Sequence, residues 1–77
     1  MNKHIELVKK WLDNPESVTQ QELDDNLDAA KVAYYAANAA YATAEAYYAA
    51  DFAAAYADAT HAKYWVKRYE ELKEQGE

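Results

Sequence analysis

The sequence has no cysteine, one proline and one glycine among 77 residues. Without cysteine, the chain can form neither a disulfide nor a thiolate metal site. The single glycine is Gly76, so the sequence contains no glycine-rich phosphate-binding loop. Pro15 is the single proline, and neither proline nor glycine occurs between Pro15 and Gly76. Residues 16–75 therefore lack the two strongest breakers of a helix.

Residues suited to catalysis are also scarce. Only His4 and His61 could act as imidazole bases, and neither has a sequence context typical of a catalytic triad. Ser17 lies where a turn or cap residue is expected. Asp58 and His61 are three residues apart, but too few other carboxylates accompany them for a bundle-type metal site. We therefore predict that the protein is not an enzyme, and we expect no catalytic residue, cofactor or metal.

Positive charge is in deficit, with 8 basic and 14 acidic residues and a net charge of -6. Nucleic-acid-binding proteins normally present a basic face to the phosphates, so we expect no direct binding to DNA or RNA. Residues 29–62 could span a bilayer by length, but they carry charges such as Glu45 and Asp51. The first residues lack the apolar core of a signal peptide. We expect a soluble, cytoplasmic protein with no membrane partner.

Residues 3–12 have the spacing of a short amphipathic helix, with Ile5, Val8 and Leu12 on one face. Pro15 is expected to end this helix, because it biases the preceding residue away from helical backbone angles.

A second helix is expected to begin at Thr19 and Glu22, which have the spacing of a capping box. Alanine, the best helix former, dominates the rest of the chain. The sequence predicts one all-α domain over residues 1–77, with a helix at 3–12, a linker at 13–19 and one long helix at 20–73.

An apolar stripe runs along this long helix at alternating spacings of three and four, as in a coiled-coil seam. A long helix cannot cover its own stripe, and the short first helix is long enough to cover only part of it. We therefore expect coiled-coil-like self-association into a homo-oligomer. The residues predicted to mediate it are Tyr34, Ala37, Tyr41, Ala44, Tyr48 and Phe52. The alternative is a helical hairpin broken near Asn38 or Asp51, residue types that tolerate turns and caps.

Several aromatic residues lie off this stripe or on its flank, and exposed aromatics at this density usually mark an interface. The carboxy-terminal part adds Trp and Arg, which often anchor interfaces. The alternatives are that these rings are the core of a bundle of more than two helices, or that they stack on a flat ligand. The predicted partner- or ligand-binding residues are Tyr64, Trp65, Lys67, Arg68, Tyr35, Tyr47 and Tyr56.

Residues 63–72 read KYWVKRYEEL and follow the Ala/Tyr run, and the first helix contains Trp11-Leu12. In these features the chain resembles small uncharacterised proteins of large tailed bacteriophages over most of its length. The resemblance implies no catalytic residues. It implies a phage accessory product, a class rich in inhibitors of host defence and host enzymes.

The leading hypothesis from the sequence is a non-enzymatic, phage-encoded inhibitor that binds a host protein through a helical aromatic surface. A second hypothesis is an oligomer that holds a nucleotide-like signalling ligand between Tyr and Trp side chains. In that case Lys63, Lys67 and Arg68 would hold the phosphates. A third is a purely structural, self-assembling helix.

Overall fold

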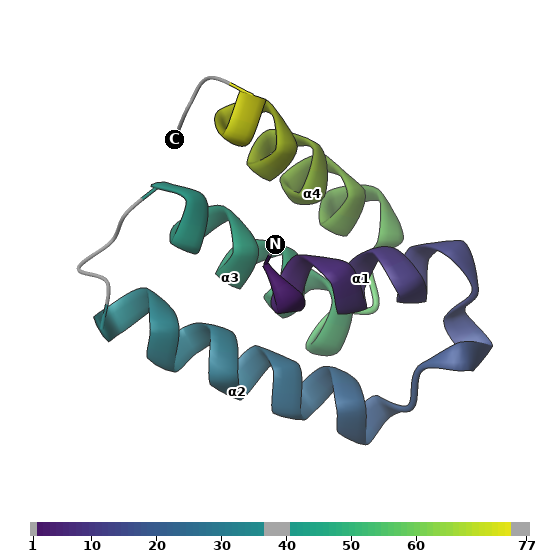
Figure 1. The fold of residues 1–77 in the computed structure, drawn as a ribbon. Coiled ribbons are helices and arrows are strands. Elements are labelled where there is room, and N and C mark those ends of the chain that lie inside the picture. Colours follow the sequence, from purple (N-terminus) through teal and green to yellow (C-terminus); the bar gives the residue numbers. More distant parts are fainter. Residues whose placement is uncertain (1, 37–40, 75–77) are drawn as a thin grey trace.

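The computed structural model describes residues 2–36 and 41–74, most of which lie in α-helices (Figure 1). The helices are α1 (Lys3–Asp13), α2 (Gln20–Ala36), α3 (Tyr41–Ala54) and α4 (Ala59–Glu74), with a 3-10 turn, η1, at Pro15–Ser17. These two ranges contain no strand. The prediction of an all-α protein is confirmed.

The helices α1 and α2 begin at side-chain caps. The side-chain oxygen of Asn2 accepts hydrogen bonds from the backbone N–H groups of His4 and Ile5, at 2.9 and 3.2 Å. Thr19 Oγ1 accepts from the N–H of Glu22 at 3.1 Å, and Glu22 Oε1 accepts from the N–H of Thr19 at 2.9 Å. The predicted capping box is confirmed, and it satisfies amide groups that have no partner inside the helix.

The single helix predicted over residues 20–73 is wrong. Helix α3 ends at Ala54, α4 begins at Ala59, and α4 packs back against α3 (Figure 1). Helix α2 also packs against α3. Of the two break points in the hairpin alternative, Asp51 lies inside α3, and Asn38 lies outside the described residues.

The turn between α3 and α4 forms without glycine or proline because side chains cap both helices. Asp58 Oδ1 accepts a hydrogen bond from the backbone N–H of His61 at 3.1 Å, which caps the start of α4. Gln20 donates to the carbonyl oxygen of Ala54 at 2.9 Å, which satisfies a group at the end of α3. Ala57 has a φ of 49° and reverses the chain between them. This long-range cap from Gln20 was invisible to local sequence reasoning.

Helix α3 is the centre of the fold. It lies between α2 and α4, and α1 crosses the bundle in contact with the other three helices (Figure 1). The most buried residues of α3 are alanines: Ala46, Ala49, Ala50 and Ala53. Their small side chains allow three neighbouring helices to approach α3 closely. Helix α1 supplies larger side chains to the core, including Ile5, Val8 and Trp11.

The predicted apolar stripe agrees with the burial in part of α2 and α4 and fails in α3. The stripe includes Leu23 and Val66, which are buried, whereas its α3 members Ala44, Tyr48 and Phe52 are only half-buried. Within α3 the buried face instead includes Ala49 and Ala53, which lie off the stripe. Alanine fits either face of a helix, so the alternation of tyrosine and alanine did not determine which face of α3 meets its neighbours.

Replacing Ala57 by glycine is expected to stabilise the fold by about 0.5–1 kcal/mol, because the Cβ of an L-residue is unfavourable at positive φ. Chemical denaturation of wild type and variant would measure the change. Ala55→Gly is the control, since Ala55 lies in the same turn and is not among the positive-φ residues. A lower free energy of unfolding for Ala57→Gly would contradict the prediction.

Candidate interaction surface

Six aromatic side chains from three helices form a connected group, named here the aromatic array. Its members are Tyr34 and Tyr35 from α2, Tyr47 and Tyr48 from α3, and Tyr64 and Trp65 from α4. The rings of Tyr34 and Tyr47 stack across α2 and α3, with centroids 5.1 Å apart. Tyr48 contacts Trp65 across α3 and α4 at 4.9 Å. These separations lie in the favourable range for aromatic pairs.

The aromatic array is open at its two ends and partly covered in its middle. Tyr35 is 66% exposed and Tyr64 is 52% exposed. The other four members are half-buried against neighbouring rings and the core. The array thus combines the two readings that the sequence left open, because its inner rings contribute to packing while its outer rings face solvent.

The exposed face of α2 continues the array with apolar and acidic side chains. Val32 is exposed and lies three residues before Tyr35, which places both on one side of the helix. Asp28 lies one turn before Val32, and Asp24 one turn further back, and both are exposed. An incoming partner that covers Tyr35 would therefore also meet a helix face on which these two carboxylates outnumber the exposed Lys31, one turn before Tyr35.

Glu45 on α3 is the unusual charged residue of this region. Its side chain is buried, and Oε2 has no hydrogen-bond partner among the described residues. The Nε of Arg68 is 3.8 Å from Oε2, which is beyond hydrogen-bonding distance. Burial raises the pKa of Glu45, and the positive charge of Arg68 partly opposes this effect. A buried carboxylate with so little compensation is costly for the folded state.

Glu45 lies close to the phenols of the aromatic array. The pKa of Tyr48 is raised, chiefly by its hydrogen bond with Tyr34, and the negative charge of Glu45 adds to the effect. The array therefore has a carboxylate beside it as well as ring faces. Sequence reasoning missed Glu45, because an isolated glutamate among alanines has no distinctive pattern.

Glu45→Gln is expected to raise the melting temperature at pH 7, because a neutral amide costs less to bury than a carboxylate. The folded-state pKa of Glu45 lies above the ordinary value of 4.5, so its destabilising contribution is absent below that value and grows as the pH rises through the folded pKa. The stability difference should therefore disappear in acid. The pKa of the neighbouring Tyr48 phenol is raised, so this phenol stays protonated throughout the range. A melting temperature lowered at pH 7 would contradict this expectation.

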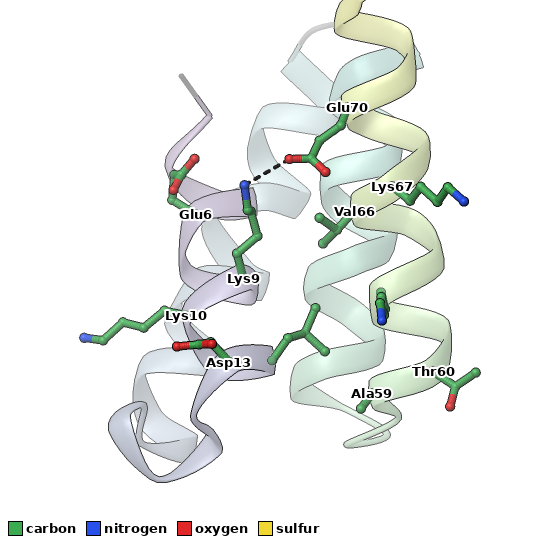
Figure 2. Close-up of a pocket in the computed structure, with 11 residues that line it drawn as sticks. Glu6, Lys9, Lys10, Asp13, Ala59, Thr60, Val66, Lys67 and Glu70 are labelled. Carbon is green, nitrogen blue, oxygen red and sulfur yellow. Dashed lines mark hydrogen bonds and ion pairs between the residues drawn. The ribbon is translucent and has the colours of Figure 1, made fainter.

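The predicted basic residues of α4 do not join the aromatic array as a group. Lys63 and Lys67 line an open groove of about 960 Å³ between α1 and α4, whereas Arg68 lies beside Glu45. Figure 2 shows Lys9 and Glu70 bridging the groove, with an Nζ to Oε2 distance of 2.9 Å, and Lys67 extending outward from its rim. Charges of both signs line this groove, which favours an inter-helix contact over a phosphate site.

Tyr56 belongs to a separate cluster. Its ring contacts Phe52 at 5.5 Å, and Phe52 stacks on His61 at 4.9 Å. His61 Nδ1 is 2.6 Å from Asp58 Oδ2, beside the cap of α4. This cluster is explained by the turn between α3 and α4. Tyr56 is nevertheless 66% exposed, as much as Tyr35.

The residues predicted for self-association do not form a single seam. Tyr34 and Tyr48 belong to the aromatic array, Phe52 contacts Tyr56, and Ala44 is half-buried. Ala37 and the side chain of Tyr41 lie outside the described residues. Because α1, α2 and α4 cover α3 within one chain, a second copy is no longer needed to bury it. Self-association stays a prediction.

The part of the chain that the structure describes bears on two further classes of site. It contains no group of three or more His, Cys, Asp or Glu side chains that could hold a metal ion. None of its helices has both the length and the apolar character required to cross a membrane.

Comparisons of the chain with protein-family models, with curated proteins and with solved structures gave no match. Its function therefore has to be inferred from its own residues.

Proposed function

We propose that this chain is a non-enzymatic interaction protein that binds a protein partner through the aromatic array. The observation that carries the proposal is the continuity of the rings across α2, α3 and α4 with Tyr35 and Tyr64 left exposed at its ends. Tyrosine and tryptophan are the residues most often found to anchor interfaces. The inner rings hold one another in place, so little side-chain entropy remains to be lost on binding.

The resemblance to phage accessory proteins extends this proposal to a biological role. In that role the chain is an inhibitor, and the partner is a host defence protein or host enzyme. The nucleotide-like ligand is the less favoured alternative, because Lys63 and Lys67 line the groove with α1 and Arg68 lies beside Glu45. The phosphate-holding cations would thus be separated from the stacking rings.

The proposal is tested by comparing three proteins as bait in a bacterial lysate: wild type, a Tyr35→Ser/Tyr64→Ser double variant and Tyr56→Ser. Tyr56 is the matched control, because it has the same exposed fraction as Tyr35, 66%, and contacts a different ring. Loss of interface anchors costs about 2 kcal/mol or more each, so the double variant should lose its specific partner at least about tenfold. Tyr56→Ser should retain it.

Circular dichroism of each bait would show that the helices are intact, and quantitative mass spectrometry would measure capture. Equal capture by all three baits would overturn the proposal. Sedimentation velocity on the same proteins tests the predicted homo-oligomer. A wild-type oligomer that the double variant dissociates, with no foreign partner captured, would assign the array to self-association instead.

A further inference from the structure

We propose that the aromatic array recognises a basic side chain, lysine or arginine, of the protein partner, with Glu45 as its counter-charge. This inference rests on the proposed function and specifies the chemistry of the partner. The structure supports it through the cluster of rings, the loosely paired carboxylate and the charge of the surrounding surface.

The first support is the concentration of ring faces. Tyr34, Tyr47 and Tyr48 lie within 6.4 Å of one another, and Trp65 lies against Tyr48. The face of an aromatic ring carries negative electrostatic potential and attracts lysine and arginine head groups, most strongly when the site is desolvated. The exposed rings of Tyr35 and Tyr64 lie at the two ends of this group, on different helices.

The second support is Glu45. Glu45 is 6% exposed, and its Oε2 lacks a hydrogen-bond donor among the described residues. A purely structural buried carboxylate is normally fully paired, because burying the charge alone destabilises the fold. The negative charge of Glu45 raises the pKa of Tyr48, so this charge lies close to the rings of the array. An arriving cation within hydrogen-bonding distance would compensate this charge more fully than Arg68 does at 3.8 Å.

Arg68 has a specific part in this arrangement. Its Nε lies 3.8 Å from Glu45 Oε2, too far for a hydrogen bond, and about half of its side chain is exposed. Glu45 Oε2 has almost no solvent-accessible surface, and the guanidinium of Arg68 lies beside it. In this proposal Arg68 is an internal competitor for Glu45 in the free protein. The partner's basic group would displace Arg68 into solvent, which its exposure permits.

The third support is the charge around the array. The chain carries a net charge of -6. On the exposed face of α2 that leads to Tyr35, Asp24 and Asp28 outnumber Lys31, which lies one turn before Tyr35. A negative surface steers a basic segment toward the array and disfavours acidic partners and nucleic acids. The complementary partner is thus a positively charged protein segment.

The test uses a short arginine-rich peptide and a counterpart in which glutamine replaces each arginine. Binding is followed by NMR at the indole N–H of Trp65, a member of the array. The arginine peptide should shift this resonance saturably, and the glutamine peptide should not. Glu45→Gln should weaken binding of the arginine peptide at least about tenfold, because the buried counter-charge is lost. Arg68→Ala should strengthen it, because the internal competitor is removed.

Asp24→Asn is the matched control, since it also removes one negative charge, but from an exposed site on α2. It should change the dissociation constant less than about twofold, because exposed charges are screened by solvent and salt. Equal weakening by Asp24→Asn and Glu45→Gln would overturn the inference in favour of non-specific charge attraction. Weaker binding by Arg68→Ala would also overturn it, since Arg68 would then be a contact residue.

The two proposals fail in different ways. If the Tyr35→Ser/Tyr64→Ser variant loses the partner in the capture experiment and Glu45→Gln does not, the array binds a partner without a cation and this inference is wrong. If neither variant loses the partner, the proposed function is wrong as well. The expected stabilisation by Glu45→Gln ensures that lost binding is not mistaken for unfolding.

Discussion

Val8→Ala is expected to lower the free energy of unfolding by about 2–3 kcal/mol. Val8 is 0% exposed and belongs to the core cluster that joins α1 to the other helices. Removing its methyl groups costs about 0.8 kcal/mol per buried CH₂, and the cavity left behind adds to the loss. The free energy of unfolding of a protein is only about 5–15 kcal/mol, so the expected loss is a large fraction of the stability.

The same substitution at Val32 is the control for Val8→Ala. Val32 is 68% exposed in α2, so Val32→Ala removes no buried surface of comparable size. Both substitutions replace valine by alanine within a helix and so gain the same helix propensity. The difference between their changes in the free energy of unfolding therefore reports burial alone. Urea denaturation followed by circular dichroism would measure both. Equal changes in the two variants would mean that α1 is not packed into the core as described.

Ala49→Leu is expected to destabilise the fold by about 3 kcal/mol, near the upper end of the usual cost of overpacking. Ala49 is 0% exposed and lies in the helix that contacts α1, α2 and α4. A leucine in α3 would push the neighbouring helices apart. These helices also pack against one another through α1, so they can move only in part to make room.

Ala29→Leu is the matched control for Ala49→Leu. Ala29 is an exposed residue in the interior of α2, so its replacement should leave the free energy of unfolding within about 0.5 kcal/mol. Thermal and denaturant unfolding of both variants would test the pair. Similar stabilities for the two variants would show that the alanine face of α3 has been assigned wrongly.

The first part of the fold could be predicted because its signals are local. The capping box at Thr19 and Glu22 predicted the start of α2, and Pro15 predicted the end of α1 to within a residue. High alanine content predicted helices throughout. Each of these features depends on residues at most a few positions apart, which is the range over which sequence patterns are informative.

The turn after Ala54 could not be predicted, because its stabilising contacts come from far along the chain. Gln20 caps the end of α3 from a distance of 34 residues. Ala57 takes up positive φ, although alanine gives no sign of that preference. Without these contacts, the alanine-rich sequence favours one continuous helix. Tertiary structure thus overrode a strong local helix propensity.

The sequence predicted most of the aromatic residues of the candidate site, but it did not predict the complete set of residues that come together there. Tyr35, Tyr47, Tyr64 and Trp65 were expected to form a binding surface, and the structure brings these rings together with Tyr34 and Tyr48. Tyr56 and Lys67 were expected there too, but they lie in the Phe52 cluster and the groove beside α1. Their separation follows from the turn, which sequence reasoning did not anticipate.

The alanine core of α3 also limits how this protein can evolve. A single-base change in an alanine codon gives glycine, serine, threonine, valine, proline, aspartate or glutamate. At Ala49 and Ala53, both almost fully buried, every one of these except glycine is larger than the native residue. Glycine fits but weakens the helix, and proline breaks it. Natural variants should therefore retain alanine at these positions.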